Sequence, residues 1–155
     1  QLHRLTSGAL AEMRTLLLEL RPTALVEVEL NELLRQAVDA FSGRSRAEAS
    51  LLLVGQHPLP EPVQLALYRI AQEALNNVAK HARATEVKVR LQMETDRAEL
   101  RIRDDGQGFD PDQVPPGCLG LKILRERARA VGATLQVTSR PGDGTEIVAV
   151  WTEAL

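Results

Sequence analysis

QEALNNVAKHA, residues 72–82, predicts the last turns of a helix around which the rest of the chain is organised. Apolar residues recur here and just upstream at the spacing of a core-facing helix. They are Leu67, Ile70, Ala71, Ala74, Leu75, Val78 and Ala82. At about 100° per residue, four polar residues beside this stripe occupy roughly a third of the helix circumference. They are Glu73, Asn77, Lys80 and His81.

A carboxylate, an amide oxygen and an ammonium group beside a buried face suit a magnesium-bound phosphate chain. From this segment alone, the alternative is an ordinary solvated helix face with helix-supporting charges. The two interpretations stay open until the rest of the chain is considered.

The composition limits the class of protein. The 155 residues fit one domain, and contents of 44% hydrophobic and 26% charged residues are typical of globular proteins. A net charge of -2 and 3% aromatic residues give no case for nucleic acid as a partner. The single cysteine, Cys118, excludes an internal disulfide and fits a reducing compartment. No apolar run approaches the roughly 20 residues that span a bilayer, so we expect no membrane contact by this chain. We expect a cytoplasmic location for it, with an upstream membrane anchor left open for the full-length protein.

The first 20 residues predict a helix with an apolar seam at Ala9, Met13, Leu16 and Leu20, which Pro22 ends. This seam needs a partner helix, which the rest of the chain, a missing upstream helix or a second subunit could supply. Because the chain starts inside a helical pattern and without a methionine, we expect it to be part of a longer protein. Residues 23–155 form the main domain, and no clear second domain is evident in the sequence.

The main domain alternates predicted helices and strands. Helices are expected over residues 30–41, 61–82 and 121–131, and strands over residues 51–54, 87–93, 100–103, 135–137 and 147–151. Residues 87–93 and 100–103 alternate apolar and polar side chains with a period of two. This pattern predicts a sheet that is covered by helices on one face only.

The segment RDDGQGF, residues 103–109, places Asp104 at a strand end, before Gly106 and Gly108. Glycine allows a positive φ and lets a ligand touch the backbone. A carboxylate at a strand end can accept a hydrogen bond from an exocyclic amine such as that of adenine. The alternative is a simple strand-to-loop turn, where aspartate and glycine are common.

Two further glycine segments occur late in the chain. PPGCLGL, residues 115–121, places Gly117 and Gly120 before a predicted helix, where free backbone amides favour phosphate. The alternative is a flexible loop at a helix start. This segment is neither a Walker A nor a G-x-G-x-x-G motif. The other segment, GDGT at residues 142–145, on its own favours a hairpin turn.

The order of these segments resembles the ATP-binding superfamily of gyrase, Hsp90, MutL and the histidine kinases. Within it, the chain is most similar to sensor histidine kinases whose partners are response regulators of the NarL type. The motifs are LYRIAQEALNNVAKHA (67–82), IRDDGQGF (102–109), GLKILRERA (120–128) and PGDGTEI (141–147). MRTLLLELRP, residues 13–22, resembles the end of the second helix of the dimerisation domain. The resemblance therefore implies that residues 1–22 are a remnant of that helix and that residues 23–155 are the ATP-binding catalytic domain. The resemblance implies a Bergerat-type α/β (α+β) two-layer sandwich, with helices on one face of a mixed, mostly antiparallel sheet.

The resemblance also implies roles for individual residues, with ATP and Mg²⁺ as cofactors. Asn77 would coordinate magnesium, and Glu73 would orient or deprotonate the attacking group. Lys80 and His81 would approach the phosphates. Asp104 would bind the adenine amine. The remaining implied ligands are Thr145, acting through water, Gly106 and Gly108, which would admit the nucleotide, and Gly117, Gly120 and Leu121, which would form the phosphate-side loop. Residues 110–116 would be a short ATP lid.

The implied function is transfer of the γ-phosphoryl group of Mg-ATP to a histidine, for relay to a NarL-type response regulator. The phosphoaccepting histidine is missing from the chain, because His3 is followed by Arg4 and Leu5 and not by the expected acid. The intact protein would form a homodimer through its upstream helices. One alternative is an ATP hydrolase or serine kinase of the same superfamily. Another is a nucleotide-responsive interaction module without transfer chemistry, against which the presence of both Glu73 and Asn77 argues.

Overall fold

The computed structural model describes Met13, residues 27–115 and residues 119–154. Its elements are α3 (Leu30–Arg44), β1 (Glu48–Val54), α4 (Glu61–Asn77), η1 (Val78–Ala82), β2 (Glu86–Glu94), β3 (Arg97–Asp104), η2 (Pro111–Gln113), α5 (Leu119–Ala130), β4 (Thr134–Ser139) and β5 (Thr145–Thr152). Except for Met13, the predicted first helix and the proposed segment 1–22 lie outside the described residues. The boundary at residue 22 stays a prediction.

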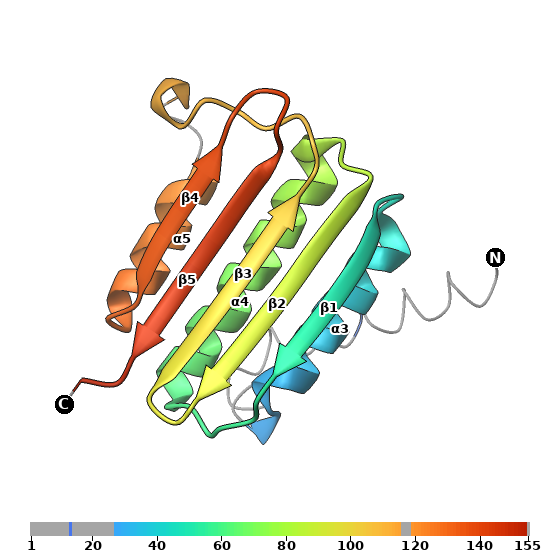
Figure 1. The fold of residues 1–155 in the computed structure, drawn as a ribbon. Helices are drawn as coiled ribbons and strands as arrows, with labels where there is room; N and C mark the ends of the chain where they lie inside the picture. The colour runs from blue at the N-terminus through green and yellow to red at the C-terminus, as the bar shows by residue number, and fades with distance from the viewer. Residues whose placement is uncertain (1–12, 14–26, 116–118, 155) are drawn as a thin grey trace.

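The strands form one five-stranded sheet in the order β1-β2-β3-β5-β4. Strands β1 and β2 are parallel, and every other neighbouring pair is antiparallel. The three described α-helices lie side by side on one face of this sheet, with α4 in the middle (Figure 1). The predicted two-layer sandwich with a mixed, mostly antiparallel sheet is confirmed.

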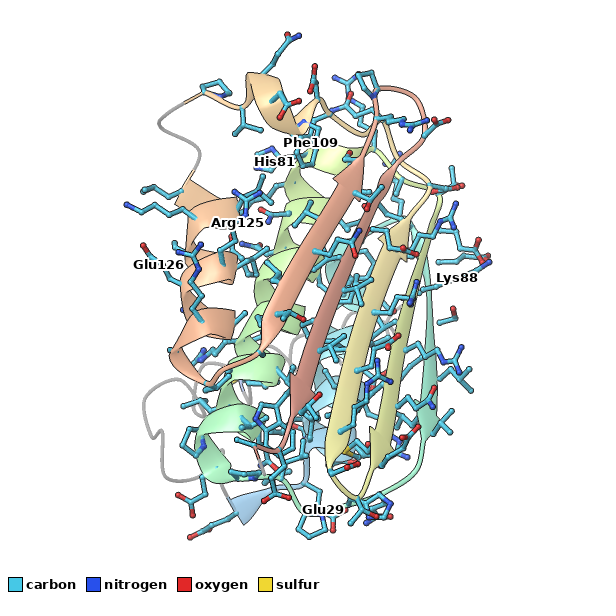
Figure 2. All side chains as sticks on the ribbon, turned by 60° about the vertical axis from the view of Figure 1, so that its left-hand side comes forward. Glu29, His81, Lys88, Phe109, Arg125 and Glu126 are labelled. Carbon is cyan, nitrogen blue, oxygen red and sulfur yellow. The ribbon has the colours of Figure 1, made fainter. Side chains whose placement is uncertain are left out.

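Alternating side chains explain why the helices cover only one face. Strand β2 buries Val87, Val89 and Leu91 against the helices, whereas Lys88 and Arg90 between them are exposed. Figure 2 shows Lys88 on the side of the sheet away from the helices. The predicted apolar stripe of α4 packs against the inner face, and Leu67, Ile70, Ala71, Ala74 and Leu75 are all essentially inaccessible to solvent.

Most boundaries differ from the sequence prediction by one to three residues; for example, α5 begins at Leu119, so that Gly120 lies in its first turn and not before it. Helix α3 continues to Arg44 instead of ending at Phe41, and β1 begins at Glu48 instead of Leu51. β1 is an edge strand whose residues alternate between exposed and half-buried. Its polar first residues therefore belong to the strand, and the apolar run captured only its second half.

The predicted helix over residues 61–82 is not α-helical throughout. Helix α4 ends at Asn77, and Val78–Ala82 form a π-helical turn, η1, which ends before Arg83 at a φ of 51°. A π-helix pairs residues i and i+5, so the uniform α-helical projection of Lys80 and His81 is wrong. Such turns are frequent at functional sites.

The sheet brings the motif-bearing segments to one end of the molecule. The end of β3, the beginning of β5, η1 and the beginning of α5 all lie towards this end (Figure 1). Within the part of the chain that the structure describes, no helix has the length and apolar character needed to cross a membrane. The fold thus places residues from four distant segments around one region.

Candidate functional site

A cavity of about 760 Å³ lies at this end, between η1, the strand ends and the beginning of α5. Most of the residues that the sequence predicted for the site line it. They are Glu73, Asn77, Lys80, His81, Asp104, Gly108, Gly120, Leu121 and Thr145. Two predicted residues are not among those lining it: Gly106 is buried away from the cavity surface, and Gly117 falls outside the described residues.

Asp104 is the buried charged group of this cavity. It is only 5% exposed, and its Oδ1 accepts a hydrogen bond from the Gly106 backbone N–H at 2.8 Å. Burial raises the pKa of Asp104, and the nearby Asp105 raises it further, against the opposing effect of the N–H groups of Gly106 and Thr145. Among the described residues no cation pairs with this carboxylate, so it is an available acceptor for a ligand donor.

Apolar side chains form the wall beside Asp104. Ile102 of β3 pairs with Ile147 of β5. Along both strands this pair lies two residues from the pair formed by Asp104 and Thr145. Both isoleucines line the cavity, and Val78 of η1 does so from the helix side. An apolar slot with one buried polar group is typical of a small-molecule binding site. Sequence reasoning missed Ile102 and Ile147, although the period of two places them on the same face as Asp104 and Thr145.

A buried hydroxyl ties the loops around this slot together. Ser139, the last residue of β4, is 7% exposed. Its Oγ lies 2.9 Å from the Phe109 backbone N, 2.9 Å from the Gly144 carbonyl oxygen and 2.9 Å from Thr145 Oγ1. Nothing in the sequence distinguished this serine, because its partners lie at distant positions and are joined only by the β4–β5 and β3–β5 pairings.

The neighbouring carboxylate, Asp105, has a different environment. It is exposed and accepts hydrogen bonds from the backbone N–H groups of Thr85 and Glu86, at 2.8 and 2.9 Å, and from the Thr85 hydroxyl. The bond from the Thr85 side chain is the main reason why the pKa of Asp105 is lowered. Asp105 therefore holds the start of β2 to the end of β3 and does not line the cavity.

The helix side of the cavity carries polar groups that converge on the start of α5. A Cβ atom added to Gly120 would lie 3.1 Å from Glu73 Oε1 and 3.4 Å from Asn77 Nδ2. Glu73 and Asn77 are four residues apart on the last turns of α4, so they share a face. Glycine at position 120 therefore leaves room beside both polar side chains.

Lys80 and His81 extend this polar side of the cavity along η1, and both are exposed. Figure 2 shows His81 and Phe109 at the same end of the molecule, and both line the cavity. Within residues 27–115 and 119–154, the side chains of Glu73, Asn77, Lys80 and His81 form no hydrogen bond or ion pair. Their polar groups are therefore available to a ligand.

Gly106 lets the loop after β3 lie close to the backbone of η1. A Cβ atom there would lie 2.3 Å from the Ala82 carbonyl oxygen. The next residue, Gln107, donates its backbone N–H to the same oxygen at 2.7 Å and its side-chain amide to the His81 carbonyl at 2.6 Å. Gly108 has a φ of 59°, and a Cβ atom there would lie 2.0 Å from the Arg140 carbonyl oxygen. The loop after β3 is thus packed directly onto η1.

The donor set is compatible with a magnesium ion that also contacts a nucleotide. Among the described residues, no three histidine, cysteine, aspartate or glutamate side chains are grouped to hold a metal by themselves. Mg²⁺ usually binds through one or two protein oxygens together with substrate phosphates and water. The Asn77 amide oxygen, with the Glu73 carboxylate one helical turn away, fits that type of site.

Comparisons with known proteins are consistent with this arrangement. Residues 63–154 match the family model described as "Histidine kinase-, DNA gyrase B-, and HSP90-like ATPase". The chain is 32% identical to the signal transduction histidine-protein kinase/phosphatase DegS of Brevibacillus brevis, over 95% of this chain and 38% of DegS. It is 35% identical to the sensor protein VraS of Staphylococcus aureus, over 94% of this chain and 42% of VraS. It therefore spans less than half the length of both proteins.

A solved structure gives the same comparison at the level of a single domain. The ATP-binding domain of PrrB from Mycobacterium tuberculosis superposes with a TM-score of 0.59 and 26% sequence identity. The superposition covers 83% of this chain and 96% of the PrrB domain.

Proposed function

The chain belongs to the family of histidine kinase-, DNA gyrase B- and HSP90-like ATPases, and we propose that it is the ATP-binding catalytic domain of a sensor histidine kinase. The observation that carries this proposal is the pairing of two unlike ends in one cavity. One end is an apolar slot beside the buried Asp104 carboxylate, and the other holds Glu73 and Asn77 beside Gly120.

The slot is the proposed base site. Asp104 accepts a hydrogen bond from the adenine amine, and Thr145 assists through water. The apolar side chains of Ile102, Ile147 and Val78 exclude water from the faces of the ring. Gly108 gives the base access to the backbone of the loop after β3, whereas the contribution of Gly106 is to hold that loop against Ala82.

The helix side is the proposed phosphate site. Asn77 is the protein ligand of a magnesium ion, whose contribution is to neutralise charge on the phosphates. Glu73 orients or deprotonates the attacking group. The remaining proposed contacts to the phosphates come from Lys80, His81, Gly120, Leu121 and Gly117. In phosphoryl transfer the protein acts mainly by positioning groups and stabilising charge, so these residues need only be held in place.

The proposal also covers the longer protein to which this chain would belong. A histidine on a preceding dimerisation domain accepts the γ-phosphoryl group and passes it to a response regulator, for which the motif resemblance supports the NarL type. Residues 1–22 are the end of that dimerisation domain, through which the intact protein forms a homodimer. This chain lies in the cytoplasm, also where an upstream segment anchors the intact protein in a membrane. Support comes from the two relatives, which are named as a histidine-protein kinase and a sensor protein and are more than twice as long as this chain.

Incubation with γ-labelled ATP and magnesium tests the function. We expect this chain to bind ATP without labelling itself, because its two histidines within the described residues are poorly placed as acceptors. His57 lies in the connection between β1 and α4, and His81 belongs to the cavity wall. Adding a separate chain that carries the preceding helices should give a label on that chain which is stable in base and labile in acid.

The other outcomes discriminate between the alternatives. Release of labelled phosphate without labelled protein would indicate a hydrolase, and an acid-stable label would indicate a serine kinase. An acid-labile label on this chain alone would mean that it contains the acceptor. Binding of ATP with neither transfer nor hydrolysis would indicate an interaction module, and no binding at all would contradict the proposal.

A further inference from the structure

The Ser139 hydroxyl is the point where three segments around the base slot meet. Phe109 follows the glycine loop after β3, Gly144 belongs to the β4–β5 turn, and Thr145 begins β5 and lines the cavity. The backbone N of Phe109, the carbonyl oxygen of Gly144 and Oγ1 of Thr145 all lie 2.9 Å from Ser139 Oγ. Ser139 itself is buried and is not among the residues that line the cavity.

The chemistry of the three partners determines which atom donates in each contact. A serine hydroxyl has one hydrogen to donate and two lone pairs that can accept. The Phe109 N–H can only donate, and it occupies one lone pair. The Gly144 carbonyl can only accept, and it receives the Ser139 hydrogen. In the third contact Ser139 can therefore only accept, so the Thr145 hydroxyl is the donor.

This assignment fixes the polarity of Thr145 towards the cavity. Its only hydroxyl hydrogen points to Ser139, so the oxygen offers lone pairs alone to a ligand or a bridging water. Asp104, its partner in the β3–β5 register, is also an acceptor when ionised. This end of the slot therefore presents two neighbouring acceptors.

We propose that Ser139 is a positioning residue that makes the Thr145 hydroxyl an acceptor and thereby favours an amino purine over a keto purine. An exocyclic amine in direct contact supplies two hydrogens to such an end, whereas a keto oxygen in the same place meets only lone pairs. The inference rests on the proposed function, because it takes the Asp104 end of the cavity as the base site. It adds a residue outside the cavity that acts on specificity through Thr145.

Nucleotide discrimination separates this role from a purely structural one. Calorimetric titrations of this chain with ATP and with inosine triphosphate, which carries a keto oxygen in place of the amine, give the ratio of the two affinities. We expect Ser139→Ala to reduce the preference for ATP by about three- to tenfold, on the order of one hydrogen bond. Without its acceptor, the Thr145 hydrogen can turn into the cavity and meet the keto oxygen.

Two further variants show whether the effect passes through Thr145. In a Thr145→Val background, Ser139→Ala should leave the affinity ratio unchanged, because no hydroxyl is left to orient. Ser139→Cys keeps most of the packing with a weaker acceptor, so it should give an intermediate ratio, and it replaces Ser139→Ala if that variant does not fold. Melting temperatures of all variants report the folding separately.

Equal weakening of both nucleotides by Ser139→Ala would overturn the inference and leave Ser139 as a loop tether. A changed ratio in the Thr145→Val background would also overturn it. If the wild-type chain bound neither nucleotide, the proposed function itself would fail. If it bound ATP and Ser139→Ala kept the ratio, only the inference about Ser139 would fail.

Discussion

The two ends of the cavity differ in how much of their polar chemistry the protein satisfies by itself. At the base end, Asp104 accepts from the Gly106 backbone, and the Thr145 hydroxyl is held by the buried Ser139. At the phosphate end, among the described residues, the side chains of Glu73 and Asn77 are bonded to no other protein group, although both lie beside Gly120.

This difference indicates a division of labour. A group that the protein already holds in one orientation costs little to organise when a ligand arrives, so the base end is suited to selecting a ligand. At the other end, the side chains that lack partners among the described residues keep their donors and acceptors for the proposed ion and phosphate chain. Changes at the base end should therefore alter affinity and selectivity, and changes at the phosphate end should alter chemistry.

Asn77→Ala should give the largest effect and test the chemical end directly. Without the amide oxygen the proposed magnesium ligand is lost, so histidine phosphorylation should fall by at least about 100-fold, as when one preorganised transition-state contact is removed. ATP should still bind weakly, because the base end is intact. The measurement is the initial rate of labelling in a chain that includes the preceding helices.

Asn76→Ala is the matched control for that experiment. Asn76 also lines the cavity, but the asparagine atoms nearest to Gly120 belong to Asn77. We expect a much smaller loss of rate for Asn76→Ala. A wild-type rate in the Asn77 variant would exclude Asn77 as the metal ligand.

Asp104→Asn should weaken ATP binding roughly tenfold or more, because a buried hydrogen bond to a charged group contributes about 1.5–3 kcal/mol. The substitution keeps the size of the side chain and replaces one acceptor oxygen with a donor. Calorimetry with a non-hydrolysable ATP analogue measures the loss. Asp105→Asn is the adjacent control, since Asp105 bonds to Thr85 and Glu86 outside the cavity. Unchanged affinity in a folded Asp104 variant would refute the base-site assignment.

Gly106→Ala should disturb the contact between the loop after β3 and η1. Its Cβ would meet the Ala82 carbonyl oxygen at 2.3 Å, which is backbone and cannot turn aside. We expect the free energy of unfolding to fall by about 1–3 kcal/mol, the usual cost of overpacking. Denaturant titration measures this loss.

Gly120→Ala separates stability from chemistry at the second glycine. Its Cβ would meet only the flexible ends of Glu73 and Asn77, at 3.1 Å or more. It should leave the free energy of unfolding nearly unchanged and slow phosphoryl transfer.

If Gly106→Ala were as stable as the wild type, the close packing of the loop on η1 would be wrong.

The sequence predicted those parts of the fold that depend on local periodicity and on motif order. The period of two in β2 and the apolar stripe of α4 are properties of the chain itself, and the structure confirms both. The identity of most cavity residues followed from four motifs whose glycines and polar residues occur in a fixed order.

The rest depends on which distant segments meet. The π-helical turn over Val78–Ala82 has the same residue types as an α-helix, and what marks it is the loop that donates to the carbonyls of His81 and Ala82. Ser139 and Asp105 acquire their roles only through partners in other strands. Gly106 shows the same limit, because its motif position indicated a ligand contact while its nearest neighbour is Ala82.

The smallest expected effect concerns the opposite pKa shifts of Asp104 and Asp105 in the ligand-free protein. Burial raises the pKa of Asp104 above its ordinary value of 3.8, so the native state binds that proton more tightly than the unfolded chain does. Its contribution to stability is complete below pH 3.8 and is lost as the pH rises through the native pKa. Hydrogen bonds, first of all from Thr85, lower the pKa of Asp105, so its contribution is present above pH 3.8 and is lost as the pH falls through the native pKa.

Melting temperatures of the wild type, Asp104→Asn and Asp105→Asn between about pH 3 and 6 therefore give differences of opposite slope. Relative to the wild type, Asp104→Asn should gain stability as the pH rises above 3.8, because the cost of ionising a buried group is removed. Relative to the wild type, Asp105→Asn should lose stability as the pH rises to 3.8 and beyond, because it lacks the favourable charged acceptor. Other carboxylates titrate in the same range, but they are common to all three proteins and cancel in the differences. Slopes of the same sign would contradict the proposed difference in role, in which Asp104 is kept for a ligand and Asp105 stabilises the fold.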